Sequence, residues 1–281
     1  MRVDRTFELA AETAVALRAA GAAAAELRRR YAAFTPIPDA PANLTTEADL
    51  AAQERILEHL RRDFPGDGIC AEESSPAARA APAPAGSRRF WVIDPLDGTR
   101  GFARRQGEFA VHVALVESGR PVLGVVVEPL AERVTWAIEG GGCWSAERGT
   151  APWRCAVSAS DAPEVLALSR SRDEASRRAL LDALGARRAV ATWSAGRKLA
   201  LVARGEADLY LGDYLTLHDW DVCAGHLLVE EAGGRVTDIG GDPIVYDGSG
   251  ASLRGKGLVA SNGRVHAAAL RALAAGRVVW R

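Results

Sequence analysis

The sequence of 281 residues has few cysteines, almost no lysine and no long apolar segment. The four cysteines are scattered without a Cys-x-x-Cys spacing, which disfavours a zinc site or a disulfide framework and fits a reducing cytosol. No apolar run approaches the roughly eighteen residues of a membrane-spanning helix. Acidic residues near the start of the chain stand where a signal peptide needs an apolar core. We therefore expect a cytoplasmic protein without a transmembrane segment.

An excess of charge of one sign is also missing. The formal net charge is −1, so the chain lacks the basic footprint that binding to a nucleic acid polymer or an anionic membrane requires. Only Lys198 and Lys256 are lysines, and the other strongly basic residues are arginines. The expected partner is a small molecule, bound by a monomer or a homodimer.

Apolar residues make up 48% of the chain, which is enough for a full core. The first half contains two amphipathic patterns, up to about residue 30 and over 45–62, followed by short strand patterns, among them a hairpin turning at Ser118-Gly119. Beyond about residue 156 strand and helix patterns alternate, as in α/β layers. We predict an α+β subdomain over residues 1–155 and an α/β subdomain over 156–281.

The most informative stretch runs from Phe90 to Phe102. Residues 90–93 are apolar and β-favouring, and Asp94-Pro95 is expected to end that strand because proline removes a ladder donor. Asp97-Gly98-Thr99 then forms a turn in which glycine allows positive φ. Two carboxylates three residues apart suit Mg²⁺, and the following N–H groups suit a phosphate. The stretch predicts a metal-dependent phosphatase.

The turn from Asp97 to Thr99 has other interpretations. A plain Asx-turn explains most isolated Asp-Gly pairs. An EF-hand loop fails because the required oxygen ligands do not follow Gly98. A phosphatase with a nucleophilic aspartate fails because Pro95 occupies the nucleophile's position. Three further acids could complete a metal centre, although each alone is more often a helix cap or a solvated charge; they are Asp49, Glu72 and Asp221.

Taken in order, these acids form the pattern Thr-x-x-Asp, Glu-Glu, Asp-Pro-Leu-Asp-Gly-Thr and Trp-Asp-x-x-Ala-Gly. This ordered set resembles the inositol monophosphatase superfamily of Mg²⁺-dependent, lithium-sensitive phosphatases. The resemblance covers nearly the whole chain, and Ala224 to Gly234 resembles the superfamily's second signature. It implies a layered αβαβα sandwich of the inositol monophosphatase and fructose-1,6-bisphosphatase type, with two or three Mg²⁺ ions at each site.

The resemblance also implies roles for individual residues. It assigns the metals to Glu72, Asp94, the carbonyl of Leu96, Asp97 and Asp221. Thr99 and Glu72 are implied to orient the attacking water, with Asp49 as the partner of Thr99, whose alternative role is a helix N-cap. The N–H groups of Gly98 and Thr99 are expected to bind phosphate oxygens.

Within the superfamily, the chain looks most like bacterial 3'(2'),5'-bisphosphate nucleotidases of the CysQ type. The similarity rests on residues 97–102, 105–109, 119–125, 169–171 and 198–210. It implies hydrolysis of the 3'-phosphate of 3'-phosphoadenosine 5'-phosphate, a role in sulfur metabolism, and substrate contacts from Lys198, Arg172, Ser194 and Asp221.

The chain departs from the nucleotidase pattern at three places. It has Arg100-Gly101-Phe102 where nucleotidases usually have Lys-Glu-Phe, and Arg172 where they usually have His. The loop from Thr35 to Asn43 lacks the family's lysine, which leaves open whether this loop contributes a metal ligand. The alternatives are therefore an inositol-1-phosphate or histidinol-phosphate phosphatase, and a catalytically inactive metal-binding regulator.

Overall fold

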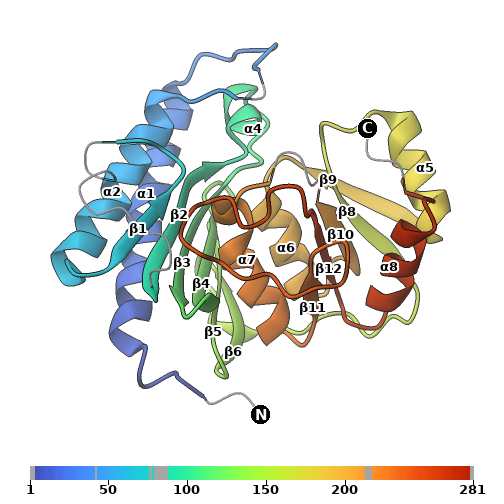
Figure 1. The fold of residues 1–281 in the computed structure, drawn as a ribbon. Helices are drawn as coiled ribbons and strands as arrows, with labels where there is room; N and C mark the ends of the chain where they lie inside the picture. Colours follow the sequence, from blue (N-terminus) through green and yellow to red (C-terminus); the bar gives the residue numbers. More distant parts are fainter. Residues whose placement is uncertain (1–3, 42, 76–77, 79–87, 213–216, 279–281) are drawn as a thin grey trace.

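The computed structural model describes residues 4–41, 43–75, 78, 88–212 and 217–278. In this part of the chain, helices and sheets stack in five layers (Figure 1). Helices α1 (Ala10–Ala33) and α2 (Glu47–Asp63) form the first layer and cover the outer face of a seven-stranded sheet. That sheet follows chain order, with a parallel β1–β2 pair and antiparallel pairs thereafter. Its strands are β1 (Gly68–Ala71), β2 (Arg89–Asp97), β3 (Ala110–Glu117), β4 (Arg120–Glu128), β5 (Arg133–Ile138), β6 (Gly142–Glu147) and β7 (Trp153–Arg154).

Helices α6 (Ala195–Ala203) and α7 (Asp219–Glu231) form the middle layer, between the first sheet and a second, five-stranded one. The order of the second sheet is β11–β12–β10–β8–β9, and the β10–β8 and β8–β9 pairs are parallel. Its strands are β8 (Val165–Ser169), β9 (Arg188–Thr192), β10 (Leu209–Gly212), β11 (Arg235–Thr237) and β12 (Leu258–Ser261). Helices α5 (Glu174–Leu184) and α8 (His266–Ala274) cover its outer face. The predicted αβαβα sandwich is confirmed.

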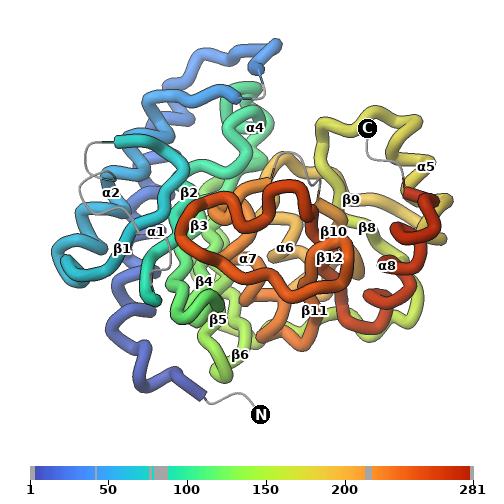
Figure 2. Tube along the Cα trace, viewed as in Figure 1, coloured from blue at the N-terminus to red at the C-terminus, as the bar shows by residue number. Residues whose placement is uncertain are grey.

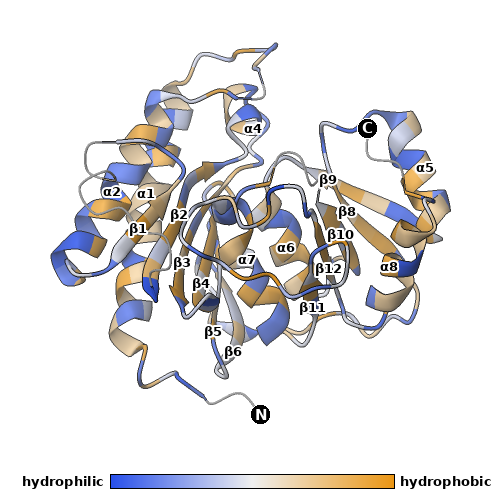
Figure 3. Cartoon of the chain, viewed as in Figure 1, coloured by the Kyte–Doolittle hydropathy of each residue, from blue (hydrophilic) through white to orange (hydrophobic). Residues whose placement is uncertain are grey.

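Strand alternation explains why the first sheet is buried on both faces. Phe90 and Val92 of β2 belong to the core shared with α6 and α7, whereas Trp91 and Ile93 belong to the core shared with α1 and α2. Successive side chains of a strand point to opposite faces, so a strand with two covered faces is apolar throughout. Figure 3 shows this pattern, with apolar strands inside and polar residues on the outer surfaces of the helices.

The predicted hairpin is confirmed: β3 and β4 pair, and Ser118 and Gly119 form a two-residue turn with φ of 49° and 81°. Positive φ at both central residues matches the twist of a hairpin. Strand β9 was not predicted, because Arg-Ala-Val-Ala-Thr shows neither strong alternation nor a long apolar run.

The predicted end of β2 at Asp94-Pro95 is wrong. The strand continues to Asp97, and its register with β3 shifts between Asp94 and Asp97. Proline is tolerated at such an irregularity, where a ladder N–H is not needed. Neighbouring β1 pairs with β2 only as far as Ile93, so Pro95 breaks no pairing on that side.

The division at residues 155 and 156 stays a prediction. The middle-layer helices α6 and α7 pack in one core cluster with residues of both sheets. Figure 2 shows the long segment between β11 and β12 passing in front of α7, and its Tyr246 N–H donates to the Gly119 carbonyl at the β3–β4 turn. None of the helices in the described part of the chain has the length and hydropathy that crossing a bilayer requires.

Candidate metal and phosphate site

A cavity of about 740 Å³ opens where β2 ends and where the short helix α4 (Thr99–Ala103) and helix α7 begin. Its lining contains the predicted carboxylates of Glu72, Asp94, Asp97 and Asp221. It also contains basic and aromatic side chains, among them Arg100, Arg172, Trp193, Lys198, Tyr210 and Trp220. A second cavity of about 670 Å³, between α5 and α8, is lined mainly by alanine and leucine and has no carboxylate among its described residues. The predicted carboxylates therefore meet in the first cavity.

The irregularity in β2 brings Asp94 and Asp97 to the same cavity. In a regular strand, residues three apart point to opposite faces. The register shift between them changes that alternation, and both side chains line the cavity. Asp94 is 1% exposed, and its Oδ1 accepts a hydrogen bond from the Leu96 N–H at 2.9 Å. Burial, with Glu72 and Asp97 nearby, raises the pKa of Asp94 well above its ordinary value.

Asp97 is held through one of its oxygens. Oδ2 accepts hydrogen bonds from Ser194 Oγ and from the Gly196 N–H at the start of α6, and it lies 3.2 Å from His112 Nε2. Burial disfavours the charged carboxylate, but His112 and Lys198 outweigh burial and lower the pKa of Asp97. Because the contacts recorded within the described chain use Oδ2, Oδ1 is left for a cation.

His112 is a site residue that the sequence analysis missed. It lies on β3 opposite Asp94, is 1% exposed, and its Nδ1 is 3.1 Å from the Trp220 carbonyl. Nε2 lies beside Asp97 but makes no hydrogen bond among the described residues. Burial disfavours the charged ring, but Asp97 outweighs burial and raises the pKa of His112.

The fit around His112 is tight, because a Cβ on Gly196 would lie 2.0 Å from Nε2. From the sequence alone, a histidine alternating with valines in a strand resembles an ordinary core residue. Its role depends on the pairing of β2 with β3, which no local pattern specifies.

Glu72 follows β1 and is positioned by α2. The amide of Gln53 holds the backbone of Glu73 from both sides, accepting from its N–H at 3.0 Å and donating to its carbonyl at 2.7 Å. Glu72 N–H donates to the Ile93 carbonyl, which continues the β1–β2 pairing. Burial and the charge of Asp221 raise the pKa of Glu72 to about 9. Glu72 Oε2 is buried and has no hydrogen-bond partner among the described residues.

Asp49 caps α2 and also contacts Thr99. Its Oδ2 accepts from the N–H and the hydroxyl of Thr46, forming a capping box at the start of α2, and its Oδ1 lies 3.0 Å from Thr99 Oγ1. The alternative that Thr99 is the N-cap of α4 is wrong, because Gly98 occupies that position with φ of 93°. A Cβ on Gly98 would also lie 2.7 Å from the Glu108 carbonyl oxygen, so this turn requires glycine.

Asp221 lies in the first turn of α7 and accepts from the N–H of its N-cap residue, His218, at 2.6 Å. Burial raises its pKa, although the bond from His218 works in the opposite direction. The Trp220 carbonyl next to it contacts His112, so the start of α7 is tied to β3. Asp221 thereby faces the same cavity as the carboxylates of β2.

The donor set fits a hard divalent cation. Four carboxylates converge on one cavity, three of them with pKa values raised partly by neighbouring carboxylates, and Glu72 offers an oxygen without a hydrogen-bond partner among the described residues. Such oxygen-rich, anionic surroundings suit Mg²⁺, Ca²⁺ or Mn²⁺. The ligand atoms of Asp94, Asp97 and His112 lie within 4.8 Å of one another. His112 lies 3.2 Å from Asp97 and supports that carboxylate.

The residues predicted to contact substrate differ in placement. Gly98, Thr99, Arg172 and Lys198 line the cavity. Ser194 requires a correction, because it is fully buried, donates to Asp97 and caps α6 through the Arg197 N–H. It contacts Asp97 and is not among the described residues that line the cavity.

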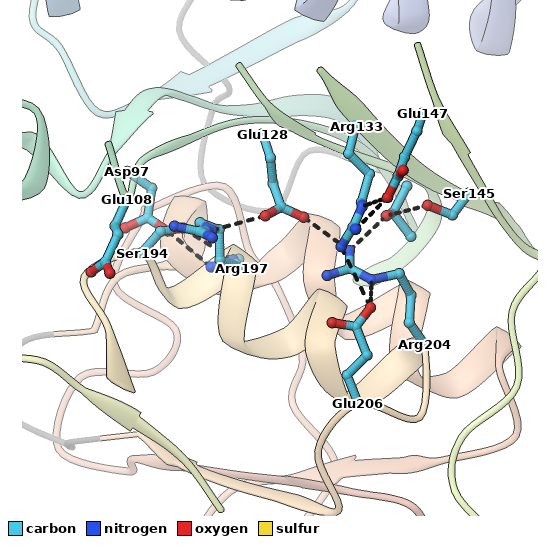
Figure 4. Close-up of polar contacts among 12 residues, drawn as sticks. Asp97, Glu108, Glu128, Arg133, Ser145, Glu147, Ser194, Arg197, Arg204 and Glu206 are labelled. Carbon is cyan, nitrogen blue, oxygen red and sulfur yellow. Dashed lines mark hydrogen bonds and ion pairs between the residues drawn. The ribbon is translucent and has the colours of Figure 1, made fainter. Parts of the chain in front are cut away.

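A buried ionic network holds α6 in place (Figure 4). Glu128, at the end of β4 and 4% exposed, accepts from Arg197 Nε and Arg204 Nη1, each at 2.9 Å. These arginines lie on α6 and at its C-cap, and Arg204 also contacts Thr135 and Glu206. The network fixes the helix whose first turn supports Asp97.

Comparison with known proteins agrees with this site. The model of the inositol monophosphatase family matches residues 8–278. The chain is 38% identical to the 3'(2'),5'-bisphosphate nucleotidase CysQ of Salmonella typhimurium over 72% of this chain and 78% of that protein. It is 32% identical to the histidinol-phosphatase of Mycobacterium tuberculosis over 89% and 92%. The solved inositol monophosphatase from Anabaena superposes with a TM-score of 0.76, covering 95% of this chain and 97% of that one at 29% identity. The chain therefore belongs to the inositol monophosphatase family, whose members are metal-dependent phosphatases.

Proposed function

We propose that this protein is a Mg²⁺-dependent phosphomonoesterase that removes the 3'-phosphate of 3'-phosphoadenosine 5'-phosphate, giving AMP and phosphate. The observation that carries the proposal is the joining, in one cavity, of four carboxylates with the ammonium of Lys198. The carboxylates suit metal binding, and the cation suits a second phosphate that is not cleaved. Nucleotidase relatives with 36–38% identity support the same substrate.

Glu72, Asp94, the Leu96 carbonyl, Asp97 and Asp221 are the proposed metal ligands. Bound Mg²⁺ supplies charge neutralisation at the phosphate and makes a water more acidic. The protein contributes by fixing these oxygens, and the clearest case is Asp97, whose Oδ2 is occupied by Ser194 and Gly196.

Thr99 and Glu72 are proposed to orient the attacking water, with Asp49 behind Thr99. The Thr99 hydroxyl has one proton and two acceptors at 3.0 Å, Asp49 Oδ1 and the Leu96 carbonyl oxygen. When it donates to either, a lone pair stays available to accept from water. The N–H groups of Gly98 and Thr99, in the first turn of α4, are proposed phosphate contacts.

Lys198 is proposed to contact the 5'-phosphate. It is 2% exposed, and its Nζ donates to the carbonyls of Thr192 and Trp193 at 3.3 and 3.1 Å. An ammonium has three protons, so one remains for a phosphate oxygen. Burial lowers the pKa of Lys198 to about 8, against the influence of Asp97, which leaves the side chain mainly charged at pH 7. Arg172, which also lines the cavity, is proposed to assist.

The decisive experiment measures kcat/KM with and without Mg²⁺ for 3'-phosphoadenosine 5'-phosphate, 3'-AMP, inositol 1-phosphate and histidinol phosphate. We expect the bisphosphate to be preferred. Histidinol phosphate is the second candidate, because a histidinol-phosphatase aligns over 89% of this chain; a preference for it would replace our proposal. Absence of Mg²⁺-dependent phosphate release from every substrate would favour the metal-binding regulator.

Variants of the two lysines test the substrate contact. Lys198→Met keeps the apolar stem beside the Tyr210 ring, 5.2 Å from Nζ, but removes the charge. We expect KM for the bisphosphate to rise about 10- to 100-fold, the effect of losing a hydrogen bond to a charged group, and KM for 3'-AMP to change little. Lys256→Ala is the matched control because Lys256 is exposed and outside the cavity lining. Equal effects of Lys198→Met on both substrates would remove Lys198 from the proposed subsite.

A further inference from the structure

One wall of the cavity contains a tryptophan to which the proposed metal and phosphate chemistry assigns no role. Trp193 directly precedes Ser194, the N-cap of α6 that supports Asp97, and its partly exposed side chain lines the cavity beside Arg100. It is therefore next in the chain to a residue that holds Asp97, and it faces the cavity that Asp97 lines.

The indole ring of Trp193 is held from several directions. Its Nε1–H donates to Gln106 Oε1. The guanidinium carbons of Arg100 and Arg104 lie 5.4 and 5.3 Å from the ring centroid, within the range of cation–π contacts. Arg100 lines the cavity, whereas Arg104 is absent from its described lining and holds the ring from outside. An aromatic ring fixed in this way needs little ordering before it binds a flat partner.

The backbone of α4 leaves room for this ring. A Cβ on Gly101 would lie 2.8 Å from Trp193 Cδ1 and 2.8 Å from the Glu108 carbonyl oxygen. Any side chain at this position would have to displace the indole, because the carbonyl cannot move without disturbing the neighbouring backbone. Gly101 and Trp193 thus form a matched pair, and the indole packs directly on the short helix α4.

We propose that Trp193, held from outside the cavity by Arg104, is a specificity-determining residue that stacks against the flat heterocyclic base of a nucleotide. This inference rests on the proposed function and adds the means by which a base is recognised. A π-face binds any base, and the loss of one stacking partner typically weakens binding substantially. Lys198 Nζ donates to the Trp193 carbonyl, so Trp193 is directly linked to the residue that is proposed to contact the phosphate.

The test compares a substrate with a base and one without. In Trp193→Leu, we expect KM for 3'-phosphoadenosine 5'-phosphate to rise about tenfold or more, with kcat/KM for glycerol 2-phosphate unchanged. Trp193→Phe keeps an aromatic face and should stay within a few-fold of the wild type. Turnover of glycerol 2-phosphate also reports that each variant is folded.

A purely structural role for Trp193 predicts the opposite result. If the indole only anchors α4, Trp193→Leu loses activity equally toward both substrates, and that outcome overturns the inference. An unchanged KM for the bisphosphate in Trp193→Leu also overturns it. Calorimetric binding of AMP separates this inference from the proposed function. If AMP binding depends on Trp193 but the protein does not hydrolyse the bisphosphate, the proposed function is refuted and stacking on Trp193 is retained. If AMP does not bind the wild type, stacking on Trp193 is refuted.

Discussion

The contact between Thr99 and Asp49 leads to a prediction in which stability and activity respond differently. Thr99→Ala removes the hydroxyl that lies 3.0 Å from Asp49 Oδ1. Asp49 is 1% exposed and its Oδ2 is already occupied by Thr46, so Oδ1 is left buried without this partner. An unsatisfied buried acceptor of this kind costs about 1–3 kcal/mol. For a chain of this size we expect Tm to fall by roughly 2–10 °C.

The effect on turnover should be larger than this loss of stability suggests. If Thr99 orients the attacking water, its removal should lower kcat by about 100-fold or more, as with other positioned catalytic groups. Thr99→Ser keeps the hydroxyl, so most of the activity and of Tm should be retained. Mg²⁺ affinity should change little in either variant, because Thr99 supplies no proposed metal ligand.

Asp49→Asn supplies the second arm of a double-mutant cycle. The amide oxygen can still accept from Thr46, but the amide NH₂ then faces Thr99 Oγ1, and the hydroxyl must donate to the Leu96 carbonyl alone. The Thr99 oxygen becomes an acceptor for the amide, which competes with the water. Because both substitutions disrupt one unit, the double variant should be no slower than Thr99→Ala alone. Multiplicative losses in kcat, or normal kcat in Thr99→Ala, would refute this coupling.

Two further predictions concern the supports of the site. In Asp97→Asn, one orientation of the amide directs its NH₂ at the metal, and the other directs it at the Gly196 N–H. We expect kcat to fall at least 100-fold, and we expect Mg²⁺ to raise Tm by less than it does in the wild type. An unchanged Mg²⁺-induced Tm shift would argue against Asp97 as a ligand. In Glu128→Gln, the amide NH₂ faces one of its arginine partners. Because breaking a buried ion pair typically costs about 3–5 kcal/mol, thermal unfolding should show a Tm lower by about 6 °C or more. Glu132→Gln, which affects the more exposed pair with Arg148, is the control and should cost at most about 1 kcal/mol.

Much of the site could be predicted because its chemistry is local in the sequence. Asp94, Asp97, Gly98 and Thr99 lie within one strand and one turn, so the chain itself holds the carboxylates near the start of α4. The short helices and strands around them also carry ordinary periodicity and turn residues. Even here the path of the backbone differed from expectation, because β2 continues through Pro95 by shifting register.

The supports of the site could not be predicted, because each depends on which elements become neighbours. His112 reaches Asp97 only because β3 pairs with β2 in one register. Glu128 meets Arg197 and Arg204 only because α6 packs beside the end of β4. Trp193 packs on Gly101 across 92 positions of sequence. Once these elements pack together, the contacts of these residues determine the charge and the geometry of the cavity.

Asp97 is one of the side chains through which the two halves of the chain are joined. Asp97 comes from β2 in the first half, whereas Ser194 and the Gly196 N–H, which fix its Oδ2, come from α6 in the second half. His112 joins the halves again, because it lies between Asp97 and the Trp220 carbonyl at the start of α7. A rigid-body displacement of the halves would therefore break hydrogen bonds on the buried oxygen of Asp97 before it changed either sheet. Since uncompensated buried charge is costly, the contacts of Asp97 oppose such a displacement and help the cavity to keep a fixed geometry.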